Sequence, residues 1–179
     1  MKDYKFFMSH LMKSDIIVDK PRSTYAYMIH IENDFHAGKH FQTMMRLSCL
    51  IESILYELLL LKLPIPPQKF LAVEIRRMQE IPLRILIDWA SGKPITKKQV
   101  KIVCYPNNWD APIINEEEGG ILHNLREMRN DIAHNPVLTY DENLKKEVIG
   151  KMINDVAPIH HKLVEEIIKI TETRKNPKL

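Results

Sequence analysis

Four polar side chains that could act on a phosphodiester lie close together just before Pro136. Arg126, Asn130 and His134 recur at every fourth position, so on a helix they form one line, with Arg129 on its flank. An imidazole titrates near neutral pH and can serve as a general acid or base. A guanidinium presents a fixed fork of donors that matches phosphate oxygens. The set therefore indicates phosphodiester chemistry, in which Asn130 would orient a catalytic group or hold the phosphate.

A helix that begins near Asn115 should position this set. Asn is a good N-cap, and Glu116, Glu117 and Glu118 would lie at the positive end of the helix dipole. Asn135-Pro136 should end the helix after His134. One apolar stripe predicts its core face, with the four polar residues on the opposite side. That stripe consists of Ile121, Leu125, Met128 and Ile132.

The spacing of Arg129 and His134 on this helix limits the directions from which the two side chains can reach one ligand. Five residues correspond to about 140° of rotation, so the two side chains would reach a ligand from either side of Asn130 and Ala133. A purely structural interpretation stays open. Arg126 and Arg129 could form surface ion pairs with Glu127 or nearby acids, His134 could cap the helix C-terminus, and Asn130 could be an ordinary surface residue.

The remaining elements are predicted to be helices as well. A short helix is expected over 24–35, and a strongly apolar one over 40–62, at the centre of a bundle or at a subunit interface. A further helix should cover about 68–90 with a break or kink at Pro82, and the segment 97–112 looks irregular. A capping box at Thr139-Tyr140-Asp141-Glu142 should open the last helix, which Pro158 should kink and which should fray from Thr171.

These elements predict an all-α fold, a bundle of about four to five main helices. Residues 1–39 are interpreted as a helical arm and 40–179 as the bundle, within a single compact domain overall. Phe41, Leu47 and Leu55 are among the residues expected in the core of the helix over 40–62.

The segment from Leu125 to Asn135 resembles the signature of the HEPN superfamily, whose members include ribonucleases of toxin–antitoxin, abortive-infection and CRISPR-associated systems. Arg129 matches the family's Arg, Asn130 its polar neighbour and His134 its His. The helix over 41–61 and the last amphipathic helix also resemble the family's bundle. The resemblance spans roughly residues 40–170, but only the short motif is specific, and the stretches before His40 and over 97–112 match nothing in it.

The resemblance implies a metal-independent endoribonuclease in a toxin or antiviral-defence role. It would cleave single-stranded RNA through the 2′-hydroxyl to a 2′,3′-cyclic phosphate, with Arg129, Asn130 and His134 catalytic and Arg126 binding substrate. It also implies a homodimer, in which two copies of the motif share one cleft. Glu52 or Glu57 could orient Arg129 or His134. The alternative is a non-catalytic HEPN-like dimerisation module that binds RNA or a protein.

Composition limits the other possibilities. A formal net charge of +3 permits a nucleic-acid partner without implying one. Five glycines and the absence of an HExxH motif or a Cys/His cluster argue against phosphate loops and zinc chemistry, so no metal and no cofactor are expected. Lys97, Lys98 and Lys101 could hold RNA or simply form a solvated loop. We expect a cytoplasmic protein without a membrane span, whose partners are RNA, a second copy and a possible antitoxin or regulatory protein.

Overall fold

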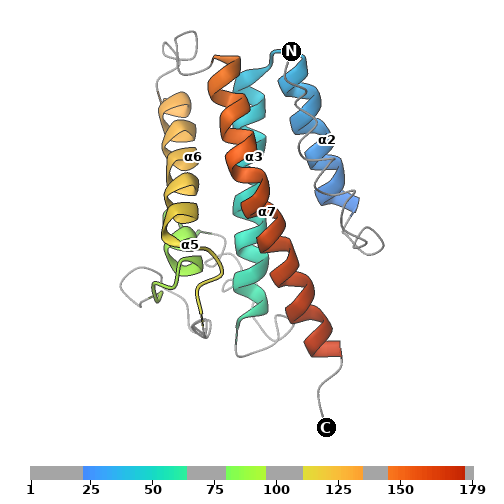
Figure 1. Cartoon of the computed structure of the whole chain (residues 1–179), viewed down its shortest axis with the longest axis vertical. Helices are drawn as coiled ribbons and strands as arrows, with labels where there is room; N and C mark the ends of the chain where they lie inside the picture. The colour runs from blue at the N-terminus through green and yellow to red at the C-terminus, as the bar shows by residue number, and fades with distance from the viewer. Residues whose placement is uncertain (1–21, 64–79, 96–110, 135–144, 176–179) are drawn as a thin grey trace. The chain divides into compact units, whose positions relative to one another are not determined.

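The structure is a computed structural model of the chain, and it describes residues 22–63, 80–95, 111–134 and 145–175 (Figure 1). These residues form five α-helices and contain no strand, which confirms the all-α class. In chain order the helices are α2 (Arg22–His36), α3 (His40–Leu61), α5 (Leu83–Ala90), α6 (Glu116–His134) and α7 (Lys146–Lys175).

The helix boundaries follow the predicted ones closely at three places. Helix α2 brackets the predicted 24–35, α3 ends one residue before the predicted position, and α6 ends at His134 as expected. Of the predicted helix over 68–90, the described part is α5, and Pro82 occupies its N-cap, where a missing amide hydrogen costs nothing. The segments 68–79 and 97–110 and the predicted capping box at 139–142 lie outside the described residues.

Two compact units divide the chain. The first comprises Met1–Ile51 and Ile121–His161, and the second comprises Glu52–Gly120 and Lys162–Leu179. Helices α3, α6 and α7 each contribute residues to both units. The predicted division between an arm over 1–39 and a bundle over 40–179 stays a prediction.

The core of the first unit is aliphatic, and polar contacts at its surface join its helices. Arg46 on α3 donates a hydrogen bond from Nε to Oδ2 of Asp34 on α2 over 2.7 Å, and its guanidinium lies 5.8 Å from the Tyr27 ring. The fully buried side chains of this unit include Ile31, Met44, Leu47, Ile51, Leu122, Leu125, Ile149 and Val156. Burying each of these side chains contributes about 1.5–3 kcal/mol before conformational entropy is subtracted.

The second unit is built around Trp89 and the leucines at the end of α3. The Tyr56 hydroxyl donates to the Ile81 carbonyl over 2.6 Å. Gly92, with a φ of 92°, follows the C-cap of α5, a position that favours glycine. The buried side chains include Leu55, Leu58, Leu59, Leu86, Ile87, Ile114 and Leu163.

Two features of the helices differ from the prediction. Phe41 was expected in the core, yet 39% of it is exposed, because it lies in the first turn of α3 at one edge of the buried face. Helix α7 does not end near Thr171 but continues to Lys175, and the Thr171 and Thr173 hydroxyls donate to the carbonyls four residues earlier. Helix α7 also runs through Pro158, the position at which the sequence predicts a kink.

Candidate functional site

A reciprocal pair of hydrogen bonds fixes the start of α6, the helix that carries the motif. The Glu118 amide donates to Oδ1 of Asn115 over 2.8 Å, and the Asn115 amide donates to Oε2 of Glu118 over 2.7 Å. This is a capping box with Asn in place of Ser or Thr, and it confirms the predicted start. Lys162 then donates to the same Glu118 carboxylate over 2.8 Å, so the cap also holds the start of α6 to α7 within the second unit.

The buried face of α6 is displaced from the predicted one. Leu122 and Leu125 are completely buried, whereas Ile121 and Met128 are only half-buried. Arg129 follows Leu125 by four residues and Leu122 by seven, so it lies on this buried face and is itself half-buried. The prediction that Arg129 lies opposite the core is therefore wrong. A long aliphatic stem lets an arginine occupy such a position while its guanidinium reaches polar groups.

Arg126 is held by its neighbour in the sequence. Its Nη2 donates to Oε1 of Glu127 over 3.0 Å, and 21% of the Arg126 side chain is exposed. Its Nε is buried and has no hydrogen-bond partner among the described residues. The ion pair considered in the structural interpretation of the sequence is therefore present. A phosphate bound by Arg126 would have to share the guanidinium with Glu127.

Asn130 and His134 are exposed and lie four residues apart on the last turns of α6. Arg129 interacts with its surroundings in the protein. The structure thus brings Asn130 and His134 onto one accessible line and places Arg129 beside it, turned toward the core. An imidazolium at the end of a helix is favoured by the negative end of the helix dipole.

The two predicted orienting carboxylates, Glu52 and Glu57, lie on α3 in the second unit, whereas Arg129 and His134 belong to the first unit. Glu52 is half-buried and Glu57 is exposed. Partial burial raises the pKa of the Glu57 carboxyl above its ordinary value. An orienting role for either residue stays a prediction.

A groove that the sequence did not predict lies beside the motif in the first unit. It has a volume of about 390 Å³ and is lined by Asn124, Glu127, Met128, Asp131, Ile132, Val148 and Met152. Its residues come from α6 and α7, and its volume lies within the range of small-molecule sites. No local sequence signal marks it, because Met128 belongs to the predicted apolar stripe of α6 and Met152 and Val148 come from another helix.

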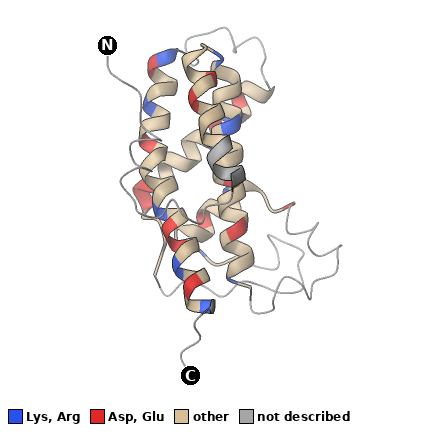
Figure 2. Cartoon of the chain, turned by 90° about the vertical axis from the view of Figure 1, so that its right-hand side faces the viewer, with Lys and Arg blue, Asp and Glu red and all other residues tan. Residues whose placement is uncertain are grey.

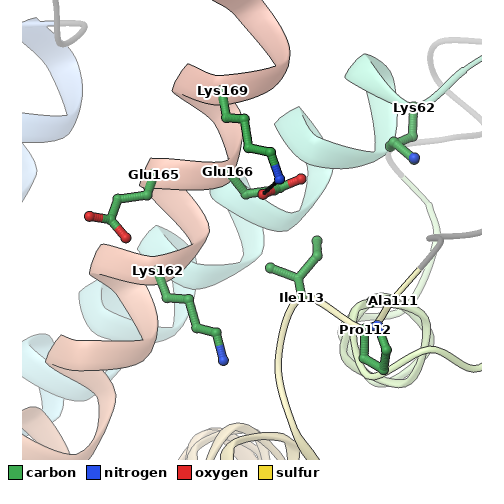
Figure 3. Close-up of a pocket in the computed structure, with 8 residues that line it drawn as sticks. All are labelled: Lys62, Ala111, Pro112, Ile113, Lys162, Glu165, Glu166 and Lys169. Carbon is green, nitrogen blue, oxygen red and sulfur yellow. Dashed lines mark hydrogen bonds and ion pairs between the residues drawn. The ribbon is translucent and has the colours of Figure 1, made fainter.

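A second hollow, of about 420 Å³, lies in the second unit, and Lys62, Lys162, Lys169, Glu165 and Glu166 are among the residues that line it. Figure 3 shows Lys169 reaching the Glu166 carboxylate, at a distance of 3.4 Å. Lys162 is paired with Glu118. Since at least two of its lysines have carboxylate partners, the hollow offers little net attraction for a phosphate.

Within the described ranges there is no group of three or more His, Cys, Asp or Glu side chains that could hold a metal ion. The predicted basic patch of Lys97, Lys98 and Lys101 lies outside the described residues. Figure 2 shows acidic and basic residues interspersed along the helices. Of the helices that the structure describes, none is long and apolar enough to cross a membrane.

Comparison of the chain with protein-family models, with curated proteins and with solved structures gave no match. The resemblance to the HEPN superfamily therefore rests on the residues Arg129, Asn130 and His134 and on their place at the end of α6.

Proposed function

We propose that this chain is a metal-independent endoribonuclease of the HEPN type, which cleaves single-stranded RNA to a 2′,3′-cyclic phosphate in a toxin or antiviral-defence role. One observation supports this above the others. The segment from Arg129 to His134 closes helix α6, and its imidazole and amide are exposed there on one line. A general acid–base group needs this accessibility, because it must come within hydrogen-bond distance of the proton that it transfers.

The chemistry assigns a role to each residue. His134 takes the proton of the 2′-hydroxyl or delivers one to the leaving 5′-oxygen. Arg129 stabilises the charge that develops on the phosphorus oxygens, and its half-buried stem restricts the directions in which its guanidinium can move. Asn130 orients the phosphate or the imidazole. One imidazole cannot act as base and acid in the same step, so the proposal includes a homodimer in which each subunit supplies one His134.

The first experiment separates His134 from other exposed histidines. Labelled single-stranded RNA is incubated in EDTA with wild type, with His134→Ala and with His36→Ala, which removes an exposed imidazole of α2. Wild type and His36→Ala should cleave and leave a 2′,3′-cyclic phosphate, and His134→Ala should lose at least a hundredfold in rate, in line with a general acid–base contribution of about 10²–10⁴. A DNA strand of the same sequence should stay intact. Equal cleavage by wild type and His134→Ala would rule out the proposed mechanism.

The role of Arg129 requires a conservative variant, because the side chain is half-buried. Arg129→Lys keeps the charge and much of the stem but loses the planar fork, so it should retain the circular-dichroism spectrum while losing rate. Arg129→Ala should also relieve any growth defect that wild type causes on expression in a bacterial host. If Arg129→Lys cleaves at the wild-type rate, the arginine does not act on the phosphate.

The dimer is tested by mixing subunits. Wild type mixed with a growing excess of His134→Ala, after exchange of subunits, should lose activity faster than dilution alone predicts. A purely proportional loss would indicate that each subunit acts alone.

A non-catalytic module that binds RNA or a protein is the second candidate. The observation in its favour is that the Arg126 guanidinium is paired with Glu127 and so already serves the structure, and Arg129 also has an interaction within the protein. In that case RNA would bind without being cleaved, and binding would be the same for wild type and His134→Ala.

A further inference from the structure

The groove on α6 and α7 has the features of a binding site for a flat, partly apolar ligand. Met128 and Ile132 from α6 face Val148 and Met152 from α7 across it. Val148 is 39% exposed, whereas the other aliphatic side chains in the first unit's part of α7 are buried. The apolar lining of the groove is therefore accessible at Val148 and partly at Met128, whereas Ile132 and Met152 are only 5% and 9% exposed and form its base.

The polar rim of the groove consists mainly of acceptors, because two of its three polar residues are carboxylates. Asn124, Glu127 and Asp131 lie on α6 in this order, each about one helical turn after the one before, and all three are exposed. Glu127 accepts a hydrogen bond from Arg126 through Oε1, which offsets part of its charge. Carboxylates repel a phosphate but accept hydrogen bonds from N–H groups. The groove is thus suited to the base of a nucleotide rather than to its phosphate.

The groove is also next to the motif. Asp131 precedes His134 by three residues, and Glu127 precedes Asn130 by three, so each carboxylate neighbours a motif side chain at roughly 5–6 Å between Cβ atoms. All of these residues belong to the first unit. A base in the groove would place the phosphate of the same or the adjoining nucleotide beside His134.

Building on the proposed function, we infer that this groove binds a guanine base of the RNA substrate and so selects the site of cleavage. Guanine presents two adjacent donors, N1–H and the N2 amino group, on its Watson–Crick edge, and one carboxylate can accept from both. Adenine and cytosine present one amino group beside a ring acceptor, and uracil presents one N–H between two carbonyls. The Asp131 carboxylate favours guanine, and Met128 and Val148, the more exposed apolar side chains of the groove, contact its flat faces.

Binding is measured separately from cleavage. Wild-type chain is titrated against fluorescent 2′-O-methyl pentamers of the form UUXUU, in which X is guanine, inosine, adenine or uracil. The methyl group blocks the nucleophile, so these RNAs bind without being cut. Inosine lacks only the N2 amino group. The guanine pentamer should bind about tenfold more tightly than the inosine pentamer, as expected for losing half of a bidentate contact.

Three variants test the assignment to the groove. Asp131→Asn should abolish the preference for guanine over inosine. Val148→Lys should weaken binding of the guanine pentamer at least fivefold, because the lysine side chain occupies the groove. Glu147→Gln removes an exposed carboxylate of α7 outside the groove and should leave the preference unchanged.

Equal binding of the guanine and inosine pentamers to wild type would overturn the inference, as would a tenfold preference that survives in Asp131→Asn. Loss of the preference in Glu147→Gln would also count against the groove. These outcomes are independent of cleavage. Cleavage of unmodified RNA without any base preference would leave the proposed function intact, whereas guanine binding without cleavage would overturn the proposed function and retain the groove as a base-binding site.

Discussion

Replacing Gly119 by alanine should destabilise the chain, whereas the same change at Gly120 should stabilise it. Both glycines lie near the start of α6 in the second unit, and neither has a positive φ. A Cβ built on Gly120 meets no atom within 4 Å, whereas one built on Gly119 lies 2.7 Å from the Ser91 hydroxyl oxygen. Identical changes at adjacent positions therefore differ in a single steric contact.

The magnitudes follow from that contact. Each substitution gains about 1 kcal/mol of helix propensity, because alanine loses less backbone entropy than glycine. Overpacking at Gly119 costs about 1–3 kcal/mol. Ser91 cannot turn away freely, since its hydroxyl donates to the Ile87 carbonyl over 2.9 Å. Gly120→Ala should therefore gain about 1 kcal/mol, and Gly119→Ala should be about 1–3 kcal/mol less stable than Gly120→Ala.

Urea denaturation followed by circular dichroism measures both free energies of unfolding. A second substitution checks the cause. Ser91→Ala removes the hydroxyl and leaves its Cβ at 3.7 Å, an ordinary contact, so Gly119→Ala should cost less in the Ser91→Ala background than in wild type. If Gly119→Ala and Gly120→Ala have the same stability, or if Ser91→Ala gives no rescue, the steric argument is wrong.

Three further substitutions test a hydrogen bond, a helix cap and a partly buried carboxyl group of the second unit. Tyr56→Phe should cost about 1 kcal/mol at pH 7 through the lost hydrogen bond to Ile81. Burial, with the charge of Glu52, raises the Tyr56 pKa to about 12, so wild type should lose roughly 1.4 kcal/mol of stability between pH 9 and 11 as the tyrosine of the unfolded chain ionises. The Phe variant should not show this loss, and parallel pH profiles of the two proteins would contradict the reasoning. Asn115→Ala should cost about 1 kcal/mol in thermal or urea unfolding, and no cost would mean that its side chain does not cap α6. Partial burial raises the Glu57 pKa, so the stability present at low pH is lost as the pH rises through that pKa. Glu57→Gln should be at least as stable as wild type at pH 7 and equal to it at pH 3, and a less stable variant at pH 7 would contradict the assignment.

The sequence predicted the parts of the fold that depend on local signals. Asn115 and the acids after it marked the start of α6, because capping uses residues within one turn. The continuous apolar pattern over 40–61 marked α3 for the same reason. Contacts between distant residues, such as Arg46 with Asp34 and Lys162 with Glu118, have no comparable local signal.

The orientation of α6 was harder to predict, and this affected the candidate site. A helical wheel weights Ile121 and Met128 as core because they are apolar, but it gives no weight to buried Gly119. It also assigns every arginine to solvent, although Arg129 lies on the buried face. The site residues themselves could be named from their types and spacing. Their exposure, and the groove beside them, depended on how α6 packs against α7.

Helix α7 continues through Pro158, and a proline nitrogen has no hydrogen to give to the carbonyl of Asn154. The backbone hydrogen bond between residues 154 and 158 is therefore missing within the part of α7 that belongs to the first unit. In the same turn, the Asn154 side-chain oxygen is buried without a donor among the described residues. In hydrogen–deuterium exchange, backbone amides on the two sides of this gap should form separate protection blocks. Residues 146–153, which include Val148 and Met152 of the groove, could then open and close without the rest of α7 unwinding.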